Sequence, residues 1–267
     1  MNCKWEELTA PDFAKAVKQV KGVCILPIGV LERHGPHLPL GTDVFQCRAL
    51  AERAAAREPA IVFPSYYFGA IHEAKHCPGT IAVRHRVLFD LLENVCEEIA
   101  RNGLRKIVIL NGHGGNEFVL PTFAMAMLEQ RRDFQVYVIR LNDYWHAALQ
   151  DPGWKRLQRS AYDWHGGETE TSLLLKLHPE LVQMGALPRR GAAPRKRLAH
   201  LPPVLTPIWW YADWPEHYAG DARPATAEKG EYLLNLLVAK VAAIIKAVKR
   251  DTRVAALEKE FFDRAQH

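Results

Sequence analysis

The stretch that decides the fold is Val23-Cys-Ile-Leu-Pro-Ile28, followed directly by Gly29-Val-Leu-Glu-Arg-His-Gly-Pro-His-Leu-Pro-Leu-Gly-Thr-Asp43. The uninterrupted apolar run predicts a strand that is buried on both faces. Thr42 then precedes an alanine-rich segment that predicts a helix to about Arg57. A buried strand that leads through a polar loop into a helix is the unit from which α/β folds are built.

Strand-like and helix-like segments alternate along the rest of the chain. Further strands are predicted where short apolar runs recur, at residues 60–63, 106–110 and 135–141. Helices are predicted where apolar residues recur at helical spacing or a capping threonine opens the segment, at residues 11–20, 87–101, 117–131, 168–177 and 226–250. Such alternation is typical of a mainly parallel sheet covered by helices on both faces. The Pro-rich and Trp-rich residues 185–225 lack periodicity, and we expect them to form an excursion from the same domain.

The composition is that of an ordinary globular protein, because 48% of the 267 residues are hydrophobic and 24% are charged. The longest apolar stretch, Leu233 to Ile245, is interrupted by Asn235 and Lys240 and is too short to span a bilayer. We therefore expect no membrane partner. The net charge of +5 is too weak to indicate a nucleic-acid partner.

Basic residues gather at one place in the chain, at Arg189, Arg190, Arg195, Lys196 and Arg197. A solvated surface loop is the simpler interpretation, and capture of an anionic substrate or of a partner subunit is the alternative. The five cysteines form no CxxC pair, and the polar N-terminal residues show no signal peptide. We therefore expect reduced thiols in a cytoplasmic protein.

Polar side chains follow two of the predicted strands directly. Glu32, His34 and Asp43 come after the strand at 23–28, and Asn111-Gly-His-Gly-Gly-Asn116 comes after the strand at 106–110. Ligands of parallel α/β sheets bind beyond the carboxyl ends of the strands. We therefore expect both segments at the same edge of the sheet.

A third polar segment, His165-Gly-Gly-Glu-Thr-Glu-Thr-Ser172, adds one imidazole and two carboxylates where a loop enters a helix. Carboxylates and imidazoles without thiolates are the ligands of Zn²⁺, Mn²⁺ or Fe²⁺. The carboxylates of Glu32, Asp43 and Glu168 would offset most of the charge of two such ions, and the remainder favours a bridging hydroxide at neutral pH. Two-metal sites of this kind hydrolyse amides and esters.

Each of these residues also has a structural interpretation. His113 can be a hydrogen-bonded loop residue, Glu32 can support a helix cap, and Asp43 is favoured at a helix N-terminus. The glycines around His113 can form a tight turn, whereas a phosphate-binding loop would need the GxxxxGK[ST] spacing. The joint occurrence of these residues at one sheet edge is what indicates a metal site.

Four segments resemble the signatures of the creatininase (creatinine amidohydrolase) family and occur in the family's order, at residues 32–43, 78–81, 111–116 and 165–172. The resemblance implies a single α/β domain over residues 1–267, built as a three-layer α/β/α sandwich. It also implies two divalent metal ions per chain and a homo-oligomer, usually a hexamer.

The same resemblance implies roles for individual residues. Glu32 and His113 would hold one metal, His34 the other, and Asp43 would bridge them. Creatininase itself has a metal-binding glutamate at the position of Gly115. Relatives with the GHGGN pattern carry a glutamate in the third segment instead, so we assign the missing ligand to Glu168.

Glu170 is the alternative ligand, but it lies two residues beyond Glu168 and would point to another side of a helix. Arg33 replaces a glutamine that is common in the family, which points away from creatinine as the substrate. His72, Glu73 and His76 follow the strand at 60–63 and could reach the same edge, so we expect them, with Arg33, to contact substrate. A surface loop with chance charges is the alternative for these three.

The leading hypothesis is a binuclear metal-dependent hydrolase in which a metal-bound hydroxide attacks a small cyclic or formyl amide. His165 is the expected general acid or base, with Glu168 beside it at the catalytic centre. The alternative for His165 is to orient a metal ligand. The partner is then a small-molecule substrate. Hydrolysis of a carbon–carbon bond in a cyclic 1,3-diketone, such as an oxidised inositol, is a second hypothesis, and a non-catalytic metal- or phosphate-binding protein on the same scaffold is a third.

Overall fold

The computed structural model describes residues 2–265, and every predicted strand is present in it. Four strands pair in the order β2-β1-β3-β4, namely β1 (Val23–Ile28), β2 (Ile61–Val62), β3 (Lys106–Asn111) and β4 (Gln135–Ile139). Each neighbouring pair is parallel. All six residues of β1 are buried, as expected for a strand inside a parallel sheet. The predicted parallel sheet is confirmed.

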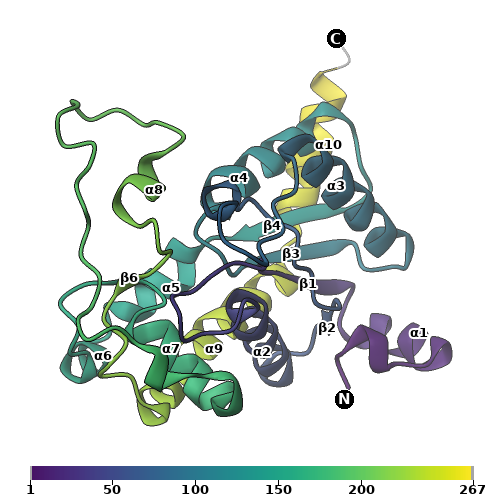
Figure 1. Ribbon diagram of the computed structural model, residues 1–267. Coiled ribbons are helices and arrows are strands. Elements are labelled where there is room, and N and C mark those ends of the chain that lie inside the picture. Colours follow the sequence, from purple (N-terminus) through teal and green to yellow (C-terminus); the bar gives the residue numbers. More distant parts are fainter. Residues whose placement is uncertain (1, 266–267) are drawn as a thin grey trace.

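Alternate residues of the strands serve two hydrophobic cores, because successive side chains of a strand point to opposite faces. Val23 and Ile25 of β1 face one core, and Cys24 and Leu26 face the other. The first core is covered by α2 (Thr42–Arg57), α5 (Leu141–Leu149), α6 (Pro152–Leu157), α7 (Glu168–Leu177) and α9 (Ala227–Arg250). The second is covered by α1 (Ala10–Gln19), α3 (His85–Arg101) and α4 (Asn116–Ala126). Helices thus lie on both faces of the sheet, which confirms the three-layer α/β/α sandwich (Figure 1).

Two helices begin at the threonines that the sequence pattern indicates. The Thr9 side chain accepts a hydrogen bond from the backbone N–H of Asp12 at the start of α1. The Thr226 side chain accepts one from the backbone N–H of Lys229 at the start of α9. These bonds satisfy N–H groups that the first turn of a helix leaves without a partner.

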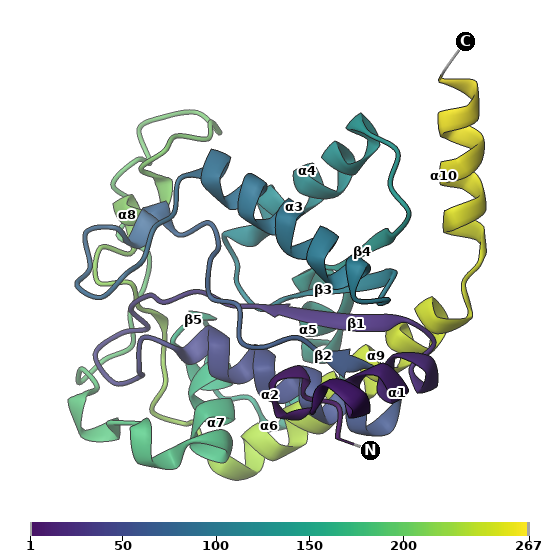
Figure 2. The ribbon, with the colours of Figure 1, turned by 90° about the vertical axis from the view of Figure 1, so that its right-hand side faces the viewer.

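The sequence pattern does not predict α5, α6 or α10 (Arg253–Arg264). The predicted helix at 117–131 is shorter in the structure, because α4 ends at Ala126 and a 3₁₀ turn (Met127–Glu129) follows. Helix α10 buries none of its residues and extends away from the sandwich (Figure 2). Its apolar residues therefore do not form the core-facing stripe on which a helix prediction depends.

Residues 185–225 are mostly irregular, as expected, and form a lobe around the short helix α8 (Trp209–Asp213). The segment returns to the body through β6 (Ala219–Gly220), which pairs antiparallel with β5 (Asp163–His165). The basic residues at 189–197 are exposed on this lobe, which agrees with a surface loop.

Two further expectations can be compared with the structure. Within residues 2–265, no helix combines the length and the apolar character that crossing a bilayer would need. Four of the cysteines are buried free thiols, namely Cys24, Cys47, Cys77 and Cys96.

Candidate metal centre

The loops that follow β1 and β3 begin side by side, because Ile28 and Asn111, the last residues of the two strands, are paired across the sheet. The loops and the start of α2 bring four titratable side chains together in the interior. Their exposed fractions are 0% for Glu32, 0% for His34, 3% for Asp43 and 6% for His113. Charged groups are rarely buried this deeply unless they are paired or bind a metal.

Asp43 lies between two histidines. Its Oδ1 is 3.0 Å from Nε2 of His34, and its Oδ2 is 2.9 Å from Nδ1 of His113. The same Nδ1 atom is 2.8 Å from Oε1 of Glu32. The two oxygens of one carboxylate therefore face two different groups of side chains, which is the arrangement that a bridging ligand requires.

The rings of His113 and His34 each make one hydrogen bond to a backbone carbonyl, and this bond determines which ring nitrogen can bind a metal. Nε2 of His113 donates to the backbone carbonyl of Ala70 at 3.0 Å. Nδ1 of His34 donates to the backbone carbonyl of Glu32 at 3.4 Å. In the neutral rings the lone pairs then lie on Nδ1 of His113 and Nε2 of His34, the atoms that face the carboxylates. Metal-binding histidines are commonly held in this way.

Two buried carboxylate oxygens, Oε1 of Glu32 and Oδ2 of Asp43, both face Nδ1 of His113, at 2.8 Å and 2.9 Å, and no other hydrogen-bond donor among the described residues. One ring nitrogen is a poor match for two buried carboxylate oxygens, because burial is costly for polar atoms that are not fully paired. A cation among these three atoms would satisfy them. Ligand atoms that lie within 4.8 Å of one another form three groups. Two of them share Asp43, namely Glu32, Asp43 and His113, and His34, Asp43 and Glu170, and the third consists of Glu32, His34 and His165. The residues present therefore fit divalent metal ions.

The structure corrects the assignment of Glu168 as a metal ligand and catalytic residue. The Glu168 carboxylate forms an ion pair with Lys229 and accepts hydrogen bonds from the backbone N–H groups of Arg159 and Ser160. Glu170 is the residue that faces the cluster, with Oε1 3.9 Å from Nε2 of His34. Two residues along a helix correspond to a rotation of about 200°, so only one of the two glutamates can face the loop after β1.

Position 115 has no room for a side chain. A β-carbon on Gly115 would lie 2.2 Å from the carbonyl oxygen of Ala70 and 2.7 Å from Nε2 of His113. These are the two atoms of the hydrogen bond that orients the His113 ring. A glutamate at this position is therefore incompatible with the observed backbone, and Glu170 supplies the carboxylate near His34.

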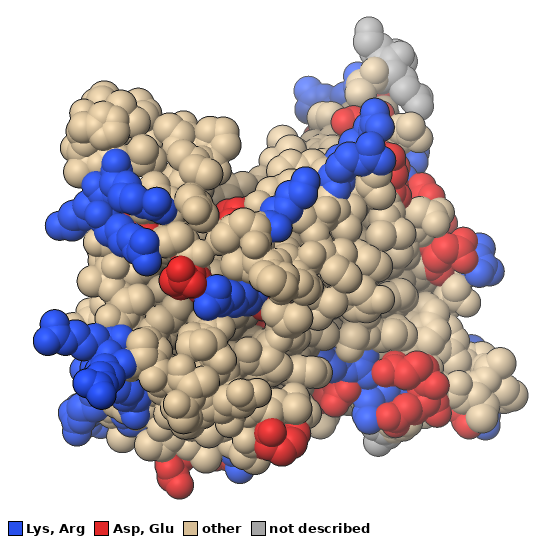
Figure 3. Space-filling view, viewed as in Figure 1, with Lys and Arg blue, Asp and Glu red and all other residues tan. Residues whose placement is uncertain are grey.

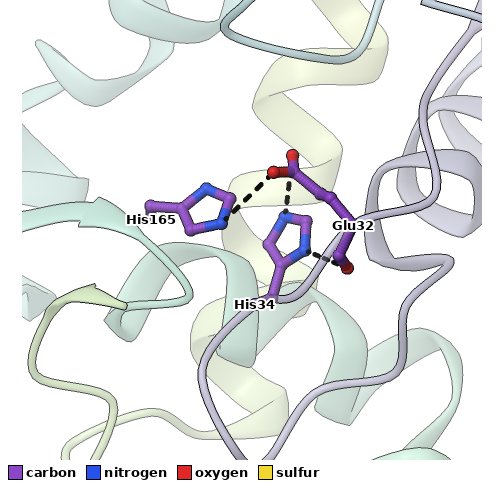
Figure 4. A group of neighbouring side chains, drawn as sticks. All are labelled: Glu32, His34 and His165. Atoms are coloured by element: carbon purple, nitrogen blue, oxygen red, sulfur yellow. Dashed lines mark hydrogen bonds and ion pairs between the residues drawn. The ribbon is translucent and has the colours of Figure 1, made fainter. Parts of the chain in front are cut away.

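His165 lies against the cluster from β5. Its ring stacks on that of His34 with 4.1 Å between centroids, and its Nε2 is 3.7 Å from Oε2 of Glu32 (Figure 4). The same Nε2 donates a hydrogen bond of 2.9 Å to the backbone carbonyl of Arg33. Burial and the neighbouring His34 hold the pKa of His165 well below its usual value, so this ring is neutral.

The carboxylates keep His34 and His113 protonated while no metal is bound. Burial opposes charge on His34, but Asp43 and Glu170 outweigh it and raise its pKa to about 10. Burial also opposes charge on His113, and Glu32 and Asp43 raise its pKa well above the usual value. The carboxylates of the cluster therefore stabilise positive charge, which the protonated rings of His34 and His113 supply in the metal-free protein.

Glu32, Asp43, His113 and Glu170 line a cavity of about 730 Å³. Figure 3 shows the molecule hollowed between the lobe around α8 and the part that carries α3 and α4. Large apolar side chains form much of the wall, among them Phe118, Trp145, Trp164, Leu205, Trp209 and Trp210. His72 and Glu73 also line the cavity, and their contact with substrate stays a prediction.

Two residues that the sequence suggested for substrate contact are not in the cavity wall. The Arg33 guanidinium pairs with Glu216 at 3.0 Å. Nε2 of His76 donates a hydrogen bond of 2.7 Å to the backbone carbonyl of Pro215, and its ring packs against Tyr211 at 4.7 Å. Both side chains hold the segment after α8 in place, so we correct their assignment from substrate contact to support of that segment.

Sequence reasoning also missed His217, which is 1% exposed and whose Nε2 is 2.5 Å from Oε2 of Glu32. Nδ1 of His217 accepts a hydrogen bond of 3.0 Å from the indole N–H of Trp210. Trp210 and His217 both belong to the mostly irregular residues 185–225. His217 is 185 positions from Glu32 along the chain. No local pattern of the sequence connects residues that far apart.

Comparison with known proteins agrees with the fold and the motifs. The Creatininase family, described as creatinine amidohydrolase, matches residues 6–245. The chain is 30% identical over 256 residues to creatinine amidohydrolase of Pseudomonas putida, which covers 90% of this chain and 95% of that relative. It is 31% identical over 251 residues to 3-dehydro-scyllo-inosose hydrolase of Thermotoga maritima, which covers 85% of this chain and 77% of the relative.

Solved creatininase structures have the same architecture. A mutant creatininase described as the Zn-Zn type has a TM-score of 0.79 at 28% identity and covers 94% of this chain and 100% of its own. A manganese form has a TM-score of 0.77 at 29% identity, with the same coverage of 94% and 100%. The family match over residues 6–245 and the identity of 30% to a creatinine amidohydrolase show that the chain belongs to the creatinine amidohydrolase family of hydrolases.

Proposed function

We propose that the protein is a binuclear metal-dependent hydrolase that cleaves the C–N bond of a small cyclic or formyl amide. The position of Asp43 carries this proposal, because its oxygens lie 3.0 Å from His34 and 2.9 Å from His113 on two sides of one carboxylate. Membership in a family of hydrolases supports the reaction class. The zinc and manganese forms of creatininase support divalent ions.

In this proposal Asp43 is shared between two ions. Glu32 and His113 complete the ligands of one, and His34 and Glu170 complete those of the other. Each ion then has three protein ligands, the number usual in catalytic sites that leave a position open. Ions in such a pair lower the pKa of water and polarise a carbonyl group.

His165 is the proposed proton carrier. Its Nε2–H is bonded to the carbonyl of Arg33, and its Nδ1 makes no hydrogen bond with any residue that the structure describes. Hydrolysis adds water across the C–N bond: the oxygen joins the carbonyl carbon and a proton joins the leaving nitrogen. Nδ1 of His165 can accept that proton from water and deliver it to the nitrogen.

The cavity limits the class of substrate. Its volume of about 730 Å³ is large for a single small ring and lies within the range of about 300–1,000 Å³ typical of sites for small organic ligands. Among residues 2–265, no lysine or arginine lines it, and these are the side chains that most often pair with phosphate groups. The indole rings of Trp145, Trp164 and Trp209 offer flat apolar surfaces. We therefore expect an unphosphorylated amide with a ring or apolar group.

Hydrolysis of a carbon–carbon bond in a cyclic 1,3-diketone is the second candidate. The similarity to an inosose hydrolase, 31% identical over 251 residues, is the observation that favours it. The same centre would add water to a ring ketone, and the carbon that leaves as an enolate would take the proton from His165 in place of nitrogen.

The two reactions are separated by turnover of simple probes on protein loaded with Zn²⁺ or Mn²⁺. Creatinine, dihydrouracil and formanilide test C–N hydrolysis, and cyclohexane-1,3-dione tests C–C hydrolysis through its ring-opened oxo acid. We expect amide turnover, and we expect His165→Asn to keep its metal but lose about 10²–10⁴-fold in kcat. Dione turnover alone would favour the second candidate. Loaded protein that is inert toward both classes and toward a metabolite pool would favour the non-catalytic alternative.

We also propose a homo-oligomer. Leu257 and Phe261 of α10 are 61% and 46% exposed on a helix that buries none of its residues, and such surfaces mark interaction sites. Sedimentation velocity should give an oligomer for the full chain. A monomer at micromolar concentration would contradict the proposal.

A further inference from the structure

His217 lies in the segment between α8 and β6 with a backbone φ of 49°, in the left-handed region that is uncommon for residues other than glycine. Its backbone is held on both sides, because its N–H donates to the carbonyl of Trp214 and its carbonyl accepts from the N–H of Gly35. The ring is buried and directed at Glu32. A costly backbone conformation that places a buried ring against a proposed metal ligand calls for a functional explanation.

The hydrogen bonds of His217 have a determined direction. The indole nitrogen of Trp210 is a donor only, so Nδ1 of His217 is the acceptor of their 3.0 Å bond. The proton of the neutral ring is then on Nε2, which donates to Oε2 of Glu32 at 2.5 Å. Trp210 thereby selects the tautomer that His217 needs in order to bind Glu32.

The hydrogen bonds from Trp210 to His217 and from His217 to Glu32 give the two carboxylate oxygens of Glu32 different surroundings. Oε2 accepts the hydrogen bond of His217, whereas Oε1 faces Nδ1 of His113 at 2.8 Å. A carboxylate held in this way presents one oxygen, in one orientation, to the group of atoms formed with Asp43 and His113.

We propose that Trp210 and His217 are positioning residues for Glu32 and that they connect the wall of the cavity to the metal centre. Trp210 of α8 and Glu32 both line the cavity. The inference rests on the proposed metal site. Its consequence is that a change in the lobe alters metal affinity at Glu32 without any change in the metal ligands themselves.

The test compares Trp210→Phe with Trp209→Phe, which removes the neighbouring indole of the same short helix. No hydrogen bond of the Trp209 indole is among the contacts of the described chain. Zinc affinity is measured by competition with a chromogenic chelator, and thermal unfolding is measured on the metal-free protein. We expect Trp210→Phe to weaken the affinity for one of the two ions about 10–100-fold, as loss of a partner of a metal ligand commonly does, and Trp209→Phe to leave it unchanged.

Two substitutions of His217 provide a rescue experiment. The amide nitrogen of Gln can reach the place of Nε2, whereas that of Asn is nearer to Nδ1. We expect His217→Gln to retain more metal affinity than His217→Asn, and we expect Trp210→Phe to cost nothing further in the His217→Asn background, because the bonds act as one chain.

Equal zinc affinities of Trp210→Phe and Trp209→Phe would overturn the inference. So would a His217→Asn variant that unfolds at a lower temperature but binds zinc as the wild type does, since its role would then be structural. Wild-type protein that binds no divalent ion would instead overturn the proposed function.

Discussion

Glu168 and Glu170 lie in the first turn of α7, and their carboxylates point to opposite sides of this helix. Glu168 is fully buried and pairs with Lys229 of α9, whereas Glu170 lies 3.9 Å from Nε2 of His34. Oε2 of Glu170 accepts a hydrogen bond of 2.6 Å from the N–H of Gly166, which directs the other oxygen toward the cluster. One glutamate therefore joins two helices, and the other is available to an ion.

This division predicts different losses for two conservative variants. Glu170→Gln should lose about one of two bound ions and most turnover, because a neutral amide is a poor metal ligand. Glu168→Gln should keep both ions but leave the largely buried Lys229 without its partner, which costs about 3–5 kcal/mol of unfolding free energy. Metal analysis and urea unfolding of the two variants give the comparison. Metal loss in Glu168→Gln at wild-type stability would contradict the assignment.

We expect Asp43 to be needed for the binding of both ions and His34 for the binding of one. Asp43→Ala removes the carboxylate that both groups of ligand atoms share, so we expect loss of nearly all bound metal. His34→Ala should retain about one ion, held by Glu32 and His113. Elemental analysis after dialysis against metal-free buffer distinguishes the two variants. Equal partial loss would show that Asp43 does not bridge.

Gly114 and Gly115 are neighbours in the loop after β3, and substitution of Gly114 is a control for substitution of Gly115. A β-carbon on Gly115 would meet the carbonyl of Ala70 at 2.2 Å, whereas one on Gly114 would have no atom within 4 Å. Gly115→Ala should therefore displace the bond that orients His113 and reduce metal affinity, and Gly114→Ala should not. Zinc titration of both variants is the measurement. A Gly115→Ala variant with wild-type affinity would mean that the His113 orientation is unimportant.

Metal binding should release protons and weaken as the pH falls. At pH 7 the metal-free protein holds His34 protonated, since the carboxylates of Asp43 and Glu170 outweigh its burial and raise its pKa to about 10. Burial raises the pKa of Glu170 to about 7, so this group also carries a proton in part. An ion binds only the deprotonated groups, so affinity should fall about tenfold per pH unit for each proton displaced.

Calorimetric titration at pH 7 in buffers of different ionisation enthalpy counts these protons. His34→Ala is the control, because metal binding at the one site that this variant retains should release fewer protons. A metal-binding enthalpy that is the same in every buffer would exclude the displacement of protons.

The local pattern of the sequence predicts the fold well because its signals lie within each element. The apolar run of β1 and the alanine-rich sequence of α2 specify these elements with no help from the rest of the chain, and their observed bounds agree with the prediction. Short helices such as α6 have too few residues to show periodicity, and α10 buries none, so neither could be predicted in this way.

Local patterns of residues are enough to predict that Glu32, His34, Asp43 and His113 gather, because each follows a strand of a parallel sheet and the carboxyl ends of such strands share one edge. The rest of the centre depends on how the elements pack in three dimensions. The packing of α7 against α9 turns Glu170, not Glu168, toward His34. The fold of the lobe around α8 brings His217 to Glu32 across 185 positions of sequence. Side-chain direction on a helix and contact between distant segments depend on how elements pack, and that information is absent from any local pattern of residues.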